Sequence, residues 1–121
     1  MAFLNDLVLD AALDEIQTNT TTLYICSAAP VTYAEASSTY ALGNKASPTV
    51  GTPGDGDTNG RKITISAISD GSVTADGTAD YWALTSGSVL YAAGDLASPQ
   101  GVSNGNTFTL TSFDIEIPDP T

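Results

Sequence analysis

Short runs of alternating apolar and polar residues fill the chain from Tyr40 onward, and this pattern most limits the possible fold. The run 62–68 places Ile63 and Ile65 on one face, and the run 107–118 alternates in the same way. Because successive side chains of a strand point to opposite faces, each run predicts a strand with one buried face. Further strands are expected at 23–27, 40–45, 72–75, 78–85 and 88–93, with turns at Ser69-Asp70-Gly71, Asp76-Gly77 and Ser86-Gly87 and a Gly/Ser/Asn-rich segment at 98–106. The pattern predicts a mainly β fold, an antiparallel β-sandwich or small, jelly-roll-like barrel, since closed sheets limit exposed edges.

One helix is expected before these strands, at about residues 3–17. Two apolar rows follow its period, Leu9-Leu13-Ile16 and Leu4-Leu7-Ala11. Asn5 can cap this helix, and Asp6 suits the positive end of the helix dipole. Two rows are wider than one small sheet needs, so we expect the helix to pack between subunits or onto a larger partner. Packing within the chain alone is the alternative.

The length of 121 residues predicts a single domain, 1–121, in which a β domain at about 22–118 follows the helix. Thr32 and Glu35 have the spacing of a capping box and predict one helical turn near 33–37. The segment 46–60 is rich in Gly, Pro and Asp, and we expect a long mobile loop there.

Charge limits the possible partners. The chain has 14 acidic residues, three basic residues and no histidine, for a formal net charge of -11. Proteins bind nucleic acid and anionic membranes through Lys and Arg, so neither is an expected partner. The N-terminal residues lack the features of a signal peptide, and no stretch has the length of a membrane span. We therefore expect synthesis in a cytoplasm and attraction to positively charged partners.

The inventory of reactive side chains argues against an enzyme and against a cofactor. Histidine, the commonest general base and metal ligand, is absent. Cys26, the single cysteine, lies in an apolar run and is expected to be a buried structural thiol. Asp114 and Glu116 could form a glycosidase pair, and Asp80 lies near Trp82, but acids two apart on a strand ordinarily form a solvated face.

Two further features have alternative interpretations. Asp55, Asp57 and Asn59 have the spacing of the first half of a calcium loop, but position twelve is Ser66 instead of Glu. A plain polar loop is the favoured interpretation, and these three residues remain the only metal candidates. Trp82 is expected in the core, and it becomes an interface candidate if it faces outward. The other interface candidates are Leu4, Leu7, Leu9, Leu13 and Ile16.

Several segments resemble a family of small structural virion proteins of tailed bacteriophages and prophages. The segments are Leu23-Tyr24-Ile25-Cys26-Ser27, Pro30, Thr32-Tyr33, Tyr40-Ala41-Leu42-Gly43-Asn44-Lys45, Gly60-Arg61-Lys62, Tyr81-Trp82-Ala83-Leu84 and Phe113-Asp114-Ile115-Glu116-Ile117-Pro118. They are spread over nearly the whole chain, and none is a mechanistic motif. The resemblance implies a capsid cement or decoration protein, a homo-oligomer expected to be a trimer, on the shell of the major capsid protein. A tail-tip or fibre component, or a carbohydrate-binding module with exposed Trp82 and Tyr91, is the alternative.

Overall fold

The computed structural model describes residues 3–119. Contacts divide these residues into two compact units. Unit 1 comprises residues 3–19, 49–67 and 111–119, and unit 2 comprises residues 20–48 and 68–110. The single expected domain therefore contains two units, and the N-terminal helix belongs to the same unit as the last strand.

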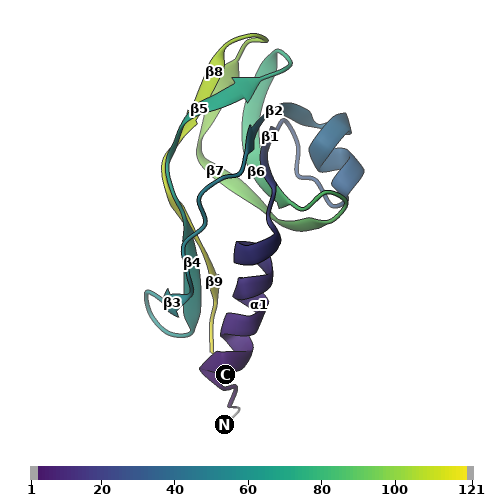
Figure 1. Cartoon of the computed structure of the whole chain (residues 1–121). Coiled ribbons are helices and arrows are strands. Elements are labelled where there is room, and N and C mark those ends of the chain that lie inside the picture. The colour runs from purple at the N-terminus through teal and green to yellow at the C-terminus, as the bar shows by residue number, and fades with distance from the viewer. Residues whose placement is uncertain (1–2, 120–121) are drawn as a thin grey trace. The chain divides into compact units, whose positions relative to one another are not determined.

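Unit 2 is built on one curled, antiparallel six-stranded sheet (Figure 1). Its strands lie in the order β7-β6-β1-β2-β5-β8. Their bounds are β1 Thr22–Cys26, β2 Ala41–Ala46, β5 Ile68–Val73, β6 Gly77–Thr85, β7 Leu90–Val102 and β8 Thr107–Leu110. Because the sheet curls like half of a barrel, it forms much of its own core.

The alternation of β1 shows how sequence selects the faces of this sheet. Leu23 and Ile25 are fully buried, and they lie opposite Leu84 and Trp82 of β6 in the antiparallel register. Tyr24 and Cys26 point to the other face, since side chains alternate along a strand. That second face is covered by η1, a five-residue π-helix at Glu35–Thr39. Both faces of β1 are therefore packed.

The predicted helical turn near 33–37 is present as this π-helix and the two helical residues before it. The hydroxyl of Thr32 accepts a hydrogen bond from the Glu35 N–H at 3.1 Å. The Glu35 carboxylate accepts one from the Val31 N–H at 2.9 Å, so the two hydrogen bonds are reciprocal as in a capping box, with Val31 in place of Thr32 as the backbone donor.

The turn expected at Ser69-Asp70-Gly71 is wrong, because these residues lie inside β5. Gly71 lies opposite Phe108 of β8, and the Phe108 ring occupies the space that a Cβ on Gly71 would need. An aromatic side chain covering a glycine on the neighbouring strand stabilises a sheet at that position. The glycine therefore serves a close approach and not a turn.

Unit 1 packs one helix against a three-stranded antiparallel sheet (Figure 1). The helix is α1, Asp6–Asn19, and the sheet has the order β3-β4-β9. The strands are β3 Gly54–Asp55, β4 Arg61–Ile65 and β9 Phe113–Ile117. Ile63 and Ile65 of β4 are fully buried, as their alternation predicts.

Two expected strands end earlier than their patterns suggest. The run 62–68 divides after Ile65, and the run 107–118 divides after Leu110. In each case two residues separate a strand of unit 1 from a strand of unit 2, and both residues are exposed. At both breaks the apolar alternation shifts by one residue, from Ile65 to Ile68 and from Leu110 to Phe113, so the sequence contained a signal of each break.

Part of the segment 46–60, expected as a loop, is paired with β4. β3 pairs with its first residues, Val50 forms a bridge with Ile65, and Gly51 donates a hydrogen bond to the Thr64 carbonyl at 2.9 Å. The fold class itself is confirmed: the chain is mainly β and antiparallel, of the β-sandwich or small-barrel kind, with one N-terminal helix.

Candidate interaction surface

The helix α1 starts where the sequence predicts. The Asn5 side chain caps it by accepting a hydrogen bond from the Leu7 N–H at 2.8 Å. Asp6 lies in the first turn, where the helix dipole favours a negative charge. The last residue is Asn19, whose side chain donates a hydrogen bond to Glu15 at 2.8 Å.

One apolar row of α1 packs within unit 1. Leu9 and Leu13 are 2% and 0% exposed, and Ile16 is half-buried. Asp10, on the same side, receives two hydrogen bonds from Arg61 of β4: Nε to Oδ1 at 2.7 Å and Nη2 to Oδ2 at 3.2 Å. A bidentate guanidinium–carboxylate pair fixes orientation as well as distance. The packing of Leu9 and Leu13 and this ion pair together hold α1 against the sheet.

The other apolar row faces solvent. Leu7 is 76% exposed and Val8 is 53% exposed. Phe3, at 83%, and Leu4, at 40%, extend the same surface before the helix begins, and Ala11 continues it one turn later. At 100° per residue, Leu7, Val8 and Ala11 lie on the side of the helix opposite Leu9 and Leu13. We call Phe3, Leu4, Leu7, Val8 and Ala11 the apolar stripe.

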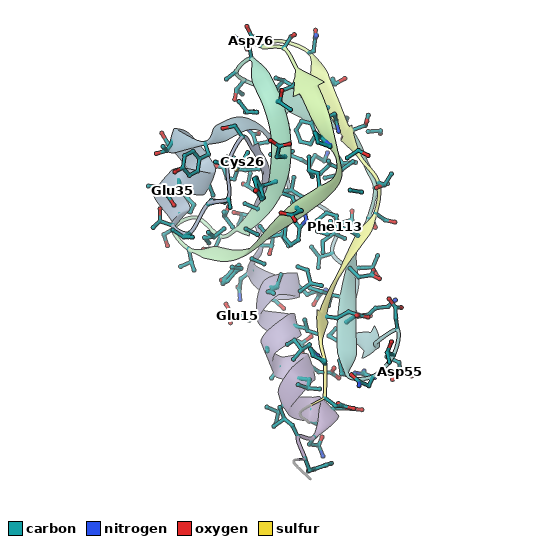
Figure 2. The ribbon with its side chains drawn as sticks, turned by 180° about the vertical axis from the view of Figure 1, so that it is seen from behind. Glu15, Cys26, Glu35, Asp55, Asp76 and Phe113 are labelled. Atoms are coloured by element: carbon teal, nitrogen blue, oxygen red, sulfur yellow. The ribbon has the colours of Figure 1, made fainter. Side chains whose placement is uncertain are left out.

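Acidic residues continue the stripe toward the C-terminal end of α1. Asp14 and Glu15 are exposed and fall on the same side of the helix as Leu7 and Val8. Figure 2 shows Glu15 directed away from β4 and β9. The exposed side of α1 is thus apolar in its first half and negative in its second.

Each of the three basic side chains already has acidic partners. Lys45 pairs with Asp70 at 3.0 Å. Arg61 pairs with Asp55 as well as Asp10, and Lys62 pairs with two aspartates of unit 1, Asp57 and Asp114. These contacts raise the pKa of Arg61, chiefly through the hydrogen bond from its side chain to Asp10. Asp10 and, at longer range, Asp6 are the acids of α1 that act on Arg61.

The calcium-loop candidates make separate contacts. Asp55 binds Arg61, Asp57 binds Lys62, and the Asn59 Oδ1 accepts a hydrogen bond from the Asp119 N–H at 3.2 Å. Within residues 3–119, no three acidic or cysteine side chains are grouped as metal ligands would be. The side-chain oxygens of Asp55, Asp57 and Asn59 therefore bind three separate partners and do not converge on one point.

Both acids of the candidate glycosidase pair, Asp114 and Glu116, also make structural hydrogen bonds. Asp114 accepts a hydrogen bond from the Thr64 hydroxyl at 2.7 Å, and Glu116 accepts one from the Asp57 N–H at 2.8 Å. The Thr64 hydrogen bond, with the Lys62 ammonium beside it, lowers the pKa of Asp114. A glycosidase acid needs a raised pKa, so the environment of Asp114 opposes that role.

Trp82 lies in the core of unit 2. It is 8% exposed, and it lies opposite Gly94 of β7, where a Cβ would come within 2.7 Å of the indole. Of the interface candidates, Leu4 and Leu7 are therefore on the surface, Ile16 is half-buried, and Leu9, Leu13 and Trp82 are buried. Val8 and Phe3 are also on this surface, and in the sequence each is next to a member of the second helical row, Leu4-Leu7-Ala11.

A tyrosine cluster in unit 2 was not anticipated. Tyr24, Tyr40 and Tyr81 are half-buried around Cys26, and a hydrogen bond joins Tyr24 to Tyr33. Burial raises the pKa of Tyr24, and the contact with Tyr33 adds to this shift. Cys26 is buried, donates to the Ala36 carbonyl at 3.6 Å, and has its pKa raised by burial to about 11. This thiol is structural, as its apolar context predicts.

No protein-family model, curated protein or solved structure matches this chain. Among residues 3–119, no helix has both the length and the apolar character needed to cross a membrane.

Proposed function

We propose that this chain is a non-enzymatic structural protein of a phage virion, a capsid cement or decoration protein that binds the lattice of the major capsid protein and stabilises the head. The observation that carries the proposal is the apolar stripe of α1. A helix that packs one apolar row inside its own unit and leaves a second row in water retains a surface suited to another protein. The resemblance of the strand segments to small virion proteins supplies the class of partner.

The charge of the chain supports the same role. A net charge of -11 limits self-aggregation of a protein made in many copies in the host cytoplasm. A protein that binds the assembled shell but not its separated subunits stabilises the shell by mass action. In the trimer that the resemblance implies, several weak contacts act together through avidity.

The carbohydrate-binding alternative loses its main support. Stacking on a sugar ring needs an exposed aromatic face, but Trp82 is buried and Tyr91 is half-buried. A tail-tip or fibre component remains the alternative within the virion, and it differs from a cement protein in copy number.

Attachment to empty heads tests the proposal. Shells of the major capsid protein from the encoding phage or prophage are incubated with the purified chain and sedimented. We expect binding at a fixed ratio to capsid subunits and a higher temperature of shell disruption. Absence of the chain from the shell pellet, or presence in purified virions at only a few copies, contradicts the proposal.

A further inference from the structure

We propose that Asn59 is a site of spontaneous deamidation in the folded chain, whereas Asn104, which also precedes a glycine, is protected by the fold. In this reaction the backbone nitrogen of the following residue attacks the side-chain amide carbon, and ammonia leaves as a cyclic imide forms. Water then opens the imide to aspartate or isoaspartate. The inference goes beyond the proposed function and does not depend on it.

Two asparagines of the chain precede glycine, in Asn59-Gly60 and Asn104-Gly105. Glycine has no Cβ, so its nitrogen approaches the preceding side chain with the least steric hindrance. Both asparagines are exposed, so water reaches both side chains. Sequence and exposure therefore do not distinguish the two sites, and the difference lies in their hydrogen bonds.

The Gly105 nitrogen is held by the fold of unit 2. Its N–H donates a hydrogen bond to the Val73 carbonyl at 3.0 Å, and the Asn104 N–H donates one to the Asp76 carboxylate at 2.7 Å. The attacking nitrogen has to give up its proton, so a bonded N–H must first leave its acceptor. One such hydrogen bond slows the attack by about fivefold, the rate equivalent of about 1 kcal/mol.

The Gly60 nitrogen lies in a different environment. Among residues 3–119, no group accepts a hydrogen bond from its N–H. The Gly60 carbonyl, in contrast, accepts one from the Gly56 N–H at 2.9 Å. Packing also requires a glycine here, since φ is 70° and a Cβ would collide with the Ile117 carbonyl oxygen. The fold therefore places an unbonded nucleophile directly after Asn59.

The side-chain carbonyl of Asn59 is polarised by a hydrogen bond. Its Oδ1 accepts this bond from the Asp119 N–H at 3.2 Å. As the Gly60 nitrogen adds to the amide carbon, negative charge develops on this oxygen. A backbone N–H aimed at a developing negative charge stabilises it, as in an oxyanion hole. Both the nucleophile and the carbonyl thus favour reaction at Asn59.

Deamidation would change the chemistry of unit 1. Exchange of the amide for a carboxylate adds one negative charge to a chain whose net charge is already -11. In isoaspartate the main chain passes through the former side chain, so the carbonyl that binds the Asp119 N–H becomes part of the backbone. We therefore expect the Asp119 amide to exchange hydrogen faster in the isoaspartate product than in the parent.

The positions of the basic residues allow the two sites to be followed separately by mass spectrometry. Trypsin cuts after lysine and arginine and yields the peptide 46–61, whose one asparagine is Asn59, and the peptide 63–121, which contains Asn104. The full folded chain is aged in mildly alkaline buffer, digested and analysed for the mass gain that exchange of NH2 for OH produces, with fragmentation to assign it. We expect Asn59 to react about fivefold faster than Asn104, or more. Equal rates, or faster reaction of Asn104, overturn the proposal.

Two controls separate the effect of the fold from the effect of local sequence. In urea, where the hydrogen bond of Gly105 is absent, we expect similar rates at both asparagines. The same preference for Asn59 in the unfolded chain contradicts selection by the fold. Asn59→Gln should abolish the mass gain in the peptide 46–61, because glutamine needs a larger ring, and Asn104→Gln is the matched variant that should leave the rate at Asn59 unchanged.

A pair of variants tests the hydrogen bond from Asp119. Asp119→Pro removes the N–H, whereas Asp119→Ala removes the carboxylate and keeps the N–H. Circular dichroism and thermal unfolding check that both variants fold as the parent does. We expect Asn59 to deamidate about fivefold more slowly in Asp119→Pro than in Asp119→Ala. Equal rates in the two variants overturn the role of the Asp119 N–H in the reaction.

Discussion

Gln100 of β7 joins the two edges of the curled sheet through both backbone groups of Thr109 in β8. Its Nε2 donates to the Thr109 carbonyl at 2.6 Å, and its Oε1 accepts from the Thr109 N–H at 3.3 Å. The side-chain amide thus takes the place of a neighbouring strand at this position. Edge strands expose unpaired backbone groups that invite aggregation, and this contact satisfies two of them.

Replacing Gln100 with Met removes both hydrogen bonds at similar side-chain size. We expect a loss of about 1 kcal/mol in the free energy of unfolding, since the site is open to water. Hydrogen exchange of the Thr109 amide should accelerate. Gln17→Met makes the same chemical change on α1 and should leave Thr109 unaffected. Unchanged exchange at Thr109 in Gln100→Met contradicts the bridging role.

Gly71→Ala should destabilise unit 2 by about 1–3 kcal/mol, because the added methyl group collides with the Phe108 ring. Gly101→Ala is the matched control: no atom lies within 4 Å of its Cβ position, and its backbone does not require glycine. We expect the control to change stability by less than about 0.5 kcal/mol. Urea unfolding of both variants measures the difference, and equal effects would rule out the proposed close approach.

Gly71 also shows what sequence could and could not predict. Ser-Asp-Gly is typical of a turn, but a turn signal does not reveal that an aromatic ring on a distant strand needs the space of the missing side chain. The mainly β class, the N-terminal helix and its Asn5 cap were predictable because they depend on local periodicity and local hydrogen bonds. The bidentate pair of Asp10 with Arg61 was not, since these residues are 51 positions apart.

The interface candidates on α1 were likewise predictable only in part. Periodicity identified both apolar rows of α1, but it could not decide which row contacts β4, because that choice depends on tertiary packing. The structure buries Leu9 and Leu13 and leaves Leu7 in water. Deleting the helix therefore removes core residues of unit 1, and substitutions in the stripe are the appropriate test of assembly.

The lowered pKa of Asp114 predicts an effect of acid on stability. A carboxylate whose pKa is lower in the folded than in the unfolded chain stabilises the fold above the unfolded value of about 3.9, and this contribution is lost as pH falls through the folded value. We expect Asp114→Asn to be less stable than the parent at neutral pH and to lose less stability below pH 4. Urea unfolding at several pH values measures this.

The hydroxyl of Thr64 is the largest cause of that lowered pKa. Thr64→Val should therefore raise the pKa of Asp114, measured by carbon NMR titration of its carboxyl group. Thr78→Val is a suitable control, because Thr78 is an exposed strand residue in unit 2. An Asp114 pKa unchanged by Thr64→Val shows that the hydrogen bond is not its main cause.

Arg61→Lys should loosen α1 although it keeps the positive charge. The guanidinium contacts both carboxylate oxygens of Asp10 and, through Nη1, Asp55 at 2.7 Å. A lysine ammonium is a point donor and cannot reproduce this planar fork. We expect lower thermal stability and faster hydrogen exchange in α1, with the amides of β1 and β6 unchanged. Lys45→Arg, the opposite exchange at the single Asp70 pair, should have little effect because a surface pair contributes little. Full protection of α1 in Arg61→Lys means that Leu9 and Leu13 alone hold the helix on its sheet, and that the ion pair does not orient the stripe.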